Sequence, residues 1–246
     1  MTSDAVVVIL AGGKGTRLAP YTTVFPKPLM PIGDKPILEI VLRQLRHYGF
    51  RNIVISVGHL AELLVTFFGD GSKFGLNIRY VSEDRPLGTM GPLTLVGDLK
   101  GPFIVMNGDL LTDIDYAALY AHHLSHGEEA TVATVTRQIQ VSLGVLEYNA
   151  LQELVAFKEK PTTTYSASMG IYVLSPTVLD LIPANTFYGF DNLMLDMLAA
   201  KRHVRVFPFN GLWLDIGRPE DYSIANETVQ QHRERFLPGL GPNGAT

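Results

Sequence analysis

The chain has 246 residues, of which 46% are hydrophobic and 18% are charged, as is ordinary for a globular domain. Its 20 basic and 24 acidic residues give a net charge of −4, which argues against nucleic acid or an anionic membrane surface as a partner. Cysteine is absent, which excludes disulfides and thiolate nucleophiles, and no signal peptide or membrane-length apolar run is recognisable. We therefore expect a cytoplasmic protein.

The chain begins with an apolar segment that leads into a glycine-rich loop. Residues 5–9 are apolar and β-branched, which predicts a buried strand. The loop after it consists of Leu10, Ala11, Gly12, Gly13, Lys14, Gly15, Thr16 and Arg17. The glycines let the backbone come close to a ligand, so that its N–H groups and the two cations could bind a triphosphate or pyrophosphate. The alternative is a tight turn with solvated cations. The dinucleotide fingerprint and the P-loop are both excluded, because Leu18 replaces a required glycine or alanine and Gly15 follows Lys14.

The first half of the chain alternates predicted strands and helices. A helix capped by Asp34, with Pro36 in its first turn, is expected to reach about Tyr48. Further strands are expected at 52–57, 78–82 and 103–106, and helices at 61–68, 90–99 and 116–125. This alternation indicates a parallel sheet, whose carboxyl edge is where ligands bind.

The second half is richer in strands. Strands are expected at 130–136, 145–148, 154–158, 167–174 and 204–207, and helices at 191–199 and 219–235. We expect the parallel sheet to give way to mixed or antiparallel strands that cover a pocket. One domain would span residues 1–236, followed by a loose Gly/Pro-rich tail at 237–246 without a β-helix repeat.

Two further loops could contact the same ligand. Lys27 lies between two prolines that restrict the loop, so it could be held against a phosphate, or it could be a surface lysine. The second loop follows a predicted strand and includes Glu83, Pro86, Gly88 and Thr89. It allows close ligand approach, and Glu83 could accept hydrogen bonds from a base edge or remain a solvated carboxylate.

Two aspartates that follow predicted strands are candidate metal ligands. Asp109 and Asp215 could hold Mg²⁺ together with substrate phosphates, because hard cations prefer carboxylate oxygens. The alternative for Asp109 is a helix cap, a role that suits Asp113 or Asp115 better. By contrast, three histidines share one predicted helix without a matching carboxylate cluster, and we interpret them as a solvated face: His122, His123 and His126.

A charged segment closes one of the later strands. Lys160 could bind a second phosphate and Glu159 could bind sugar hydroxyls, or the pair could be an ordinary charged strand end.

Six segments in this order resemble the sugar-1-phosphate nucleotidyltransferases over residues 5–230. They are residues 10–18, 25–28, 86–89, 107–109, 159–161 and 213–222. The resemblance, strongest to the mannose- or heptose-1-phosphate guanylyltransferases, implies a Rossmann-like mixed sheet flanked by helices, the nucleotide-diphospho-sugar transferase fold. It also implies Mg²⁺-assisted, in-line formation of a nucleotide-sugar and pyrophosphate from a nucleoside triphosphate and a sugar 1-phosphate.

The resemblance also implies roles for individual residues. Arg17 would grip the leaving phosphates and Lys27 the α-phosphate, while Asp109 and Asp215 hold Mg²⁺. Lys160 would bind the sugar phosphate, and Glu159 and the backbone of Gly144 would meet sugar hydroxyls. Ser168 and Gly170 belong to a segment in which many relatives have Asn-Ala-Gly, so this sugar pocket departs from the family pattern.

Several alternatives stay open. GTP is favoured because guanine offers two adjacent donors to a carboxylate such as Glu83, but uridylyl or thymidylyl transfer to glucose 1-phosphate is the runner-up. A non-catalytic nucleotide-sugar sensor is a further alternative. A molybdopterin guanylyltransferase or phosphocholine cytidylyltransferase is disfavoured by the segments at 159–161 and 213–217. Homodimer formation is left open.

Overall fold

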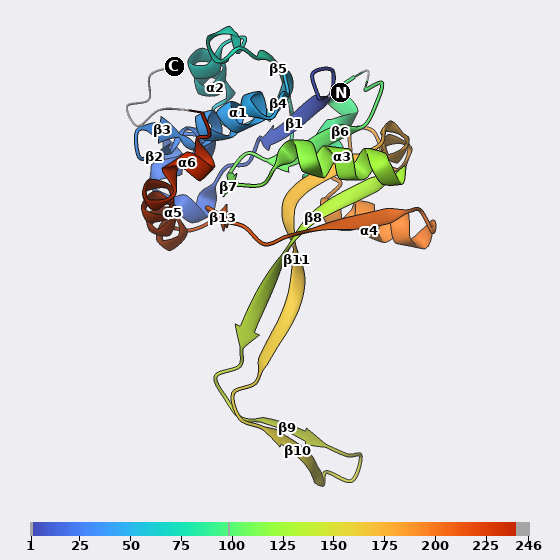
Figure 1. Ribbon diagram of the computed structural model, residues 1–246. Helices are drawn as coiled ribbons and strands as arrows, with labels where there is room; N and C mark the ends of the chain where they lie inside the picture. The colour runs from blue at the N-terminus through green and yellow to red at the C-terminus, as the bar shows by residue number, and fades with distance from the viewer. Residues whose placement is uncertain (1, 98, 240–246) are drawn as a thin grey trace.

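The strands of the main sheet follow the apolar segments of the sequence. In the computed structural model, which describes residues 2–97 and 99–239, they are β1 (Val6–Ala11), β4 (Asn52–Val57), β5 (Asn77–Ser82), β6 (Phe103–Asn107), β8 (Ala130–Gln140), β11 (Thr162–Leu174) and β12 (Val204–Phe209). Over the described residues they form one seven-stranded sheet in the order β12-β8-β11-β6-β1-β4-β5 (Figure 1). Four of them, β6, β1, β4 and β5, are parallel neighbours, whereas β11 is antiparallel to both β6 and β8. The expected change from a parallel to a mixed sheet is therefore confirmed.

Helices cover both faces of the sheet and complete the α/β architecture. They are α1 (Ile37–His47), α2 (Ala61–Phe68), α3 (Tyr116–His126), α4 (Phe190–Ala199), α5 (Pro219–Gln231) and α6 (Arg233–Phe236). Alternate residues of β1 face opposite sides, so Val7 and Ile9 join a core with α1, α3 and α5, whereas Val8 joins a second core with α4. Burial on both faces explains why the strand is apolar throughout.

Short elements fill the connections. They are the 3-10 helices η1 (Thr16–Leu18), η2 (Tyr21–Thr23), η3 (Lys27–Leu29), η4 (Ser72–Phe74), η5 (Gly91–Leu95) and η6 (Pro176–Leu181), and the strands β2 (Pro31–Ile32), β3 (Lys35–Pro36), β7 (Leu110–Thr112), β9 (Val145–Tyr148), β10 (Leu154–Lys158) and β13 (Trp213–Asp215). The helix expected over 90–99 is instead the single 3-10 helix η5. Pro92 in its first turns lacks an N–H group, and Gly97 has a φ of 78°, so a longer α-helix does not form.

Asp34 does not cap α1, contrary to expectation. It lies in the turn between β2 and β3, and Pro36 occupies the N-cap position. The Asp34 carboxylate instead pairs with Arg233 on α6 at 3.0 Å and with Lys35 at 3.2 Å. The Arg233 hydrogen bond is the main reason that the pKa of Asp34 is lowered to about 2. The N-cap of α3 is Asp115, as proposed, whose Oδ1 accepts a 2.8 Å hydrogen bond from the Ala118 N–H.

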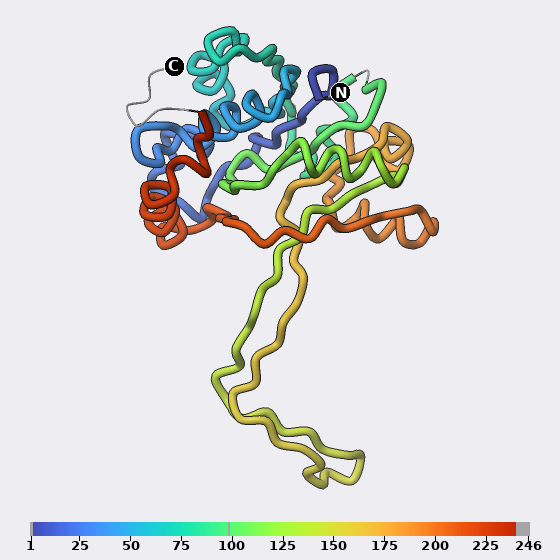
Figure 2. The backbone as a smooth tube through the Cα atoms, viewed as in Figure 1, coloured from blue at the N-terminus to red at the C-terminus, as the bar shows by residue number. Residues whose placement is uncertain are grey.

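A two-stranded arm projects from the body, and it is defined here as residues 135–167. β8 and β11 continue past the sheet as a ribbon, paired from Val135↔Ala167 to Gln140↔Thr162, and end in the antiparallel hairpin β9–β10. Figure 2 shows the two strands of the arm running side by side away from the body. The expectation that these strands cover a pocket is therefore not met within one chain.

The C-terminal segment is ordered at least through its first residues. Leu237 is buried in the same core as α5, whereas 240–246, the rest of the expected tail, lie outside the described residues.

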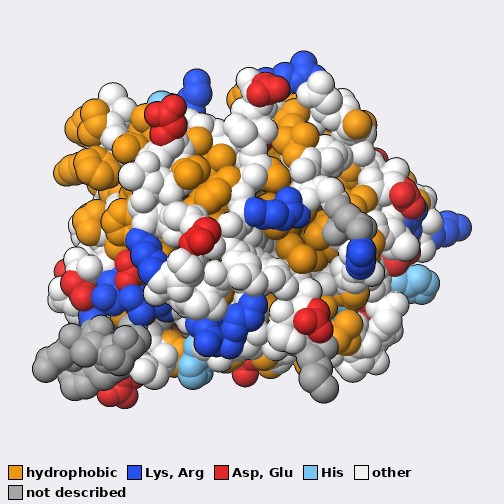
Figure 3. Space-filling view, turned by 90° about the horizontal axis from the view of Figure 1, so that it is seen from above, with side chains coloured by type: hydrophobic (Ala, Val, Ile, Leu, Met, Phe, Trp, Pro, Cys, Tyr) orange, Lys and Arg blue, Asp and Glu red, His pale blue; other side chains and the backbone are white. Residues whose placement is uncertain are grey.

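The surface agrees with the small net charge. On the face shown in Figure 3, basic, acidic and apolar side chains are interspersed. None of the helices in the described residues has the length and apolar composition needed to cross a membrane.

Candidate active site

The main cleft lies at the carboxyl ends of β1 and β6. The chain leaves β1 toward β4 and β5 on one side and later returns to β6 on the other, so this is the switch point of the sheet. The cleft has a volume of about 430 Å³, within the range of small-molecule sites. Its lining includes these expected residues: Leu10, Ala11, Gly12, Gly13, Gly15, Arg17, Lys27, Glu83, Pro86, Gly88, Thr89 and Asp109.

The glycine-rich loop enters the cleft directly from β1. A Cβ at Gly12 would lie 2.5 Å from Glu83 Oε1, so a larger residue there would displace the Glu83 carboxylate from its position. The hydroxyl of Thr22 donates to the Gly15 carbonyl at 2.8 Å and fixes the turn that aims Arg17. Lys14 is exposed and is not among the lining residues.

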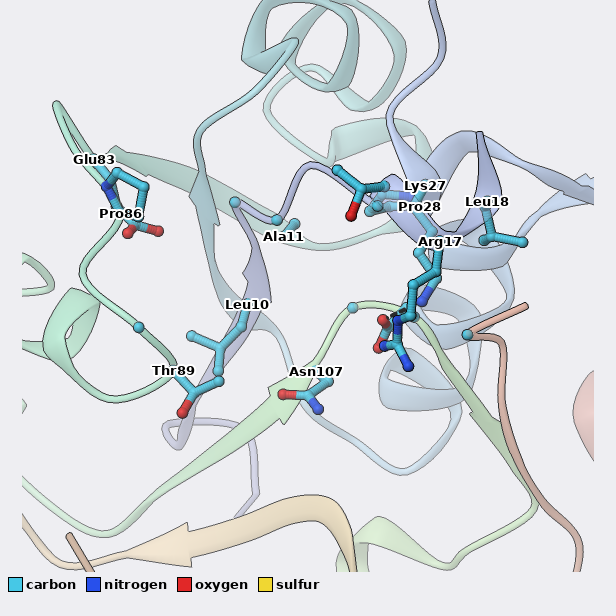
Figure 4. Close-up of a pocket in the computed structure, with 18 of the residues that line it drawn as sticks. Leu10, Ala11, Arg17, Leu18, Lys27, Pro28, Glu83, Pro86, Thr89 and Asn107 are labelled. Atoms are coloured by element: carbon cyan, nitrogen blue, oxygen red, sulfur yellow. Dashed lines mark hydrogen bonds and ion pairs between the residues drawn. The ribbon is translucent and has the colours of Figure 1, made fainter. Parts of the chain in front are cut away.

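The two expected cationic side chains, Arg17 and Lys27, lie at the same end of the cleft but differ in burial and in pairing (Figure 4). Lys27 is 7% exposed on η3, where adjacent prolines restrict the backbone, and its ammonium group pairs with Asp109. The guanidinium of Arg17 has no hydrogen-bond or ion-pair partner in the described part of the chain. An uncommitted guanidinium at the mouth of a cleft is suited to grip phosphate oxygens.

Asp109 and Asp215 come together across the fold. Asp215 on β13 pairs with Leu110 on β7, and the following Ile216 N–H donates to the Asp109 carbonyl at 3.3 Å. Partial burial, and then the negative charge of Asp109, raise the pKa of the Asp215 carboxyl. A carboxylate whose pKa is raised by a neighbouring carboxylate lies where negative charge is concentrated, and such a place favours a cation.

The carboxylate pair fits a magnesium ion. Asp109 Oδ1 is buried and has no hydrogen-bond partner in the described residues, while Oδ2 is engaged by Lys27. Over the same residues no group of three or more His, Asp or Glu side chains is arranged to hold a metal. This agrees with the preference of Mg²⁺ for one or two carboxylates plus substrate phosphates.

The opposite end of the cleft is formed by the loop after β5 (Figure 4). Glu83 Oε1 accepts a 3.0 Å hydrogen bond from the Ser56 hydroxyl, and Oε2 accepts a 2.8 Å bond from the Leu87 N–H. These bonds orient the carboxylate, so any base-edge contact uses its remaining lone pairs. Gly88 has a φ of 78°, and a Cβ there would lie 2.7 Å from the Tyr188 carbonyl, which explains why glycine is required.

Gly170 reaches the wall of the cleft, whereas Ser168 lies at the root of the arm. A Cβ at Gly170 would lie 2.8 Å from Nδ2 of Asn107, which itself lines the cleft. The Ser168 hydroxyl donates to the Tyr172 hydroxyl at 3.1 Å and accepts from the Gly170 N–H at 3.2 Å. The polar group that replaces the amide of many relatives is thus bound to its own strand.

The other three expected sugar-phosphate residues lie on the arm. Gly144, Glu159 and Lys160 are exposed and are not among the residues that line the cleft. They are close to one another, since a Cβ at Gly144 would be 3.2 Å from Glu159 Oε2. The structure therefore keeps this expected group together but brings it to a different part of the molecule.

Several lining residues were not among the candidates. Asn107 and Gly217 fall within segments that the resemblance singled out, so their positions after β6 and β13 could have identified them. Phe187 also lines the cleft and is 67% exposed, but it lies in an irregular loop before α4 and carries no sequence signal.

The histidines of α3 differ from one another. His123 is buried, not solvated as expected, because its ring faces Thr131 Oγ1 at 3.0 Å and Ser175 Oγ at 3.2 Å. Burial lowers its pKa. The rings of His122 and His126 are tilted by 43° with their centroids 4.4 Å apart, and among the described residues no group of three or more His, Asp or Glu side chains is arranged to hold a metal.

The mixed sheet flanked by helices, with a glycine-rich loop at its switch point, matches solved nucleotidyltransferases of the nucleotide-diphospho-sugar transferase fold. The family model described as "Nucleotidyl transferase" matches residues 6–232, and the chain belongs to this family of enzymes. The resemblance seen in the sequence is therefore confirmed at the level of the family.

Named relatives differ in the nucleotide that they use. The chain is 34% identical over 250 residues to a "Mannose-1-phosphate guanyltransferase" of Schizosaccharomyces pombe, covering 96% of this chain and 68% of that protein. It is 34% identical over 259 residues to a "UTP--glucose-1-phosphate uridylyltransferase" of Synechocystis, covering 95% and 66%. The structure of HddC from Yersinia pseudotuberculosis complexed with GMP-PN matches with a TM-score of 0.71 and 26% identity, covering 92% of this chain and 99% of that one. The chain thus spans about two thirds of the length of those two curated relatives.

Proposed function

We propose that this nucleotidyltransferase makes a nucleotide-sugar and pyrophosphate from a nucleoside triphosphate and a sugar 1-phosphate. GTP and a mannose- or heptose-type sugar phosphate are the favoured substrates. The observation that carries the proposal is that the two ends of the cleft differ in chemistry. Arg17, Lys27 and Asp109 line one end, with Asp215 beside Asp109, and the Glu83 loop lines the other, which suits a triphosphate joined to a base.

The reaction that this arrangement supports is a direct displacement of pyrophosphate by the sugar phosphate. An oxygen of the sugar phosphate attacks the α-phosphorus and forms a new P–O bond. The bond between the α-phosphorus and the bridging oxygen breaks, and pyrophosphate leaves with that electron pair. Arg17 grips the phosphates that leave, and Lys27 steadies the α-phosphate that remains. Catalysis then consists of positioning two anions and stabilising the charge that develops, for which no protein nucleophile is required.

Mg²⁺ would be held by Asp109 and Asp215, with phosphate oxygens completing its coordination. When bound, the ion supplies positive charge that offsets the triphosphate and the leaving pyrophosphate. Lys27 already neutralises Asp109 on one oxygen, so the unpartnered Oδ1 is the atom available to the metal.

The relatives support two different nucleobases in the nucleoside triphosphate. The guanylyl relative and the GMP-PN complex favour GTP, and the remaining lone pairs of Glu83 could accept from the two adjacent donors of guanine. The uridylyl relative has the same identity and nearly the same coverage, so uridylyl transfer to glucose 1-phosphate is the second candidate.

Pyrophosphate release tests the proposal directly. GTP, UTP, dTTP, CTP and ATP would each be combined with mannose-, glucose- and heptose-1-phosphates in the presence of Mg²⁺. We expect release only when both substrates are present, and fastest with GTP. Faster release with UTP or dTTP would overturn the choice of base. Nucleotide binding without turnover, even with rarer sugar phosphates, would favour a non-catalytic sensor and refute the proposed reaction.

A further inference from the structure

The hairpin at the end of the arm has one apolar face that none of the described residues covers. In the pairing of β9 with β10, Leu146 is opposite Phe157 and Tyr148 is opposite Leu154, so all four side chains share a face. They are between 56% and 71% exposed. The other face carries the Glu147–Lys158 ion pair at 2.8 Å. An isolated two-stranded hairpin is marginal in water, so this one-sided pattern indicates a surface that packs against protein.

Contacts at the base of the arm hold it so that it extends away from the cleft of its own chain. The register of β11 against β8 shifts between Ser168 and Tyr172, and Gly170, within this bulge, has a φ of 73°. The indole N–H of Trp213 donates to the Met169 carbonyl at 2.9 Å, and the Arg137 guanidinium lies 4.8 Å from the Trp213 ring centroid. Folding the arm back onto its own cleft would break these contacts and the β8–β11 ladder.

The charged group at the bend between the ribbon and the hairpin is separated from the cleft of its own chain. From Ser168 to Thr162 the strand extends about 20 Å at roughly 3.3 Å per residue, and Glu159 and Lys160 lie beyond it. Lys160 has a backbone φ of 43°, rare for a lysine and disfavoured before a proline. A strained, exposed lysine beside a glutamate, at the bend between the ribbon and the hairpin, suggests a group that contacts something outside its own chain.

Exposed apolar side chains adjoin the residues that line the cleft. Tyr21, Val24 and Phe25, in the segment between Arg17 and Lys27, are 55–65% exposed, and Phe187 lines the cleft itself and is 67% exposed. Among the described residues, those that line the cleft include Arg17, Lys27 and Asp109, and none of them belongs to the arm.

We propose that two copies of this chain form a two-fold dimer in which each arm crosses to the other copy. The apolar face of the hairpin packs on the partner, and Glu159 and Lys160 complete the partner's cleft on its sugar-phosphate side. The same surfaces meet twice in such an isologous pair, so both clefts are completed together. The identity of the ligand that Lys160 meets rests on the proposed function.

Complementation between two defective chains tests the exchange. Arg17→Ala damages the cleft and Lys160→Ala damages the arm; co-expression with two different tags and sequential affinity purification isolate the mixed dimer. In an exchanged dimer the intact cleft of the Lys160→Ala chain receives the intact arm of the other chain. We expect about half of wild-type turnover per dimer, because one of two sites is complete. Turnover no higher than that of the parent variants would overturn the proposal.

A control dimer that carries both substitutions in one chain should give the opposite result. When Arg17→Ala and Lys160→Ala are combined in one chain and paired with a wild-type chain, the wild-type cleft receives a defective arm. Exchange then predicts turnover near that of Lys160→Ala alone. Half of wild-type turnover would show that each arm serves its own cleft, as would happen if it closed back on the body.

Two measurements do not depend on turnover and separate this proposal from the proposed reaction. Light scattering should give twice the chain mass of 27.0 kDa, and a monomeric wild type would refute the dimer. Changing Leu146 and Phe157 to Ser should yield monomers, while the matched polar-face changes Glu147→Ser and Lys158→Ser should not. Because the chain has no cysteine, Lys160→Cys can carry a single thiol-directed photo-cross-linker. Adducts with residues 10–28 of a second chain are expected, and adducts within one chain would overturn the exchange.

Discussion

The ion pair between Lys27 and Asp109 allows a quantitative test of how the carboxylate pair is neutralised. In the Lys27→Met variant the side chain keeps its approximate shape but loses its charge, and Asp109 then faces Asp215 without its paired ammonium group. Removing one partner of a fully buried pair costs about 3–5 kcal/mol, and an exposed pair is worth about 0–1 kcal/mol. The side chains are 8% and 28% exposed, so we expect an intermediate loss of about 2 kcal/mol, or about 4–8 °C in melting temperature.

The assay is thermal and urea unfolding with and without Mg²⁺. The double variant Lys27→Met/Asp109→Asn should regain most of the lost stability, because the unpaired charge is gone. Mg²⁺ should stabilise Lys27→Met more than wild type, because the ion replaces the missing ammonium charge between the carboxylates. An unchanged melting temperature, or a double variant as unstable as the single one, would refute this account of the pair.

Three other substitutions test separate parts of the structure. Arg17→Ala should lower turnover about 100- to 1,000-fold, as for loss of one transition-state contact, yet shift unfolding by less than about 0.5 kcal/mol because its exposed guanidinium makes no hydrogen bond or ion pair with the described residues; near-normal pyrophosphate release would contradict its role. Gly88→Ala should destabilise the fold by about 1–3 kcal/mol and weaken nucleotide binding in calorimetry, since its Cβ meets the Tyr188 carbonyl. Burial lowers the pKa of His123, so folding favours the neutral ring, and stability is full above about pH 6.5 and declines as the pH falls toward the folded-state pKa. His123→Gln should flatten this acid decline in urea titrations, whereas His126→Gln should leave it; equal curves for both would be inconsistent with the assignment.

Much of the body could be predicted because local signals and tertiary structure agree there. The strand at 52–57 and the helix at 61–68 have the predicted bounds, since burial of both sheet faces requires continuous apolar residues and Gly69 ends the helix. Errors arose where a local signal competed with another element. Asp34 resembles a cap but lies in the β2–β3 turn, where Arg233 from the far end of the chain binds it.

The site was predictable only in part, for a geometric reason. Residues that directly follow parallel strands, such as Arg17 and Asp109, must lie near one sheet edge, so the sequence order indicates their proximity. The position of Lys160 depends instead on the register of two long strands and on a bulge at Gly170. Neither the register nor the bulge has a clear signature in residue types, and the direction of the arm could not be inferred.

The single tryptophan of the chain makes the root of the arm observable by light. Trp213 donates to the Met169 carbonyl, contacts Arg137 of the arm, and is two residues before Asp215 in β13. Its emission spectrum and quenching by added iodide therefore report on one junction, between the projecting strands and the end of the cleft where Asp109 lies. Occupancy of the cleft and any movement of the arm can thus be followed in the unlabelled protein, in real time and without a coupled enzyme.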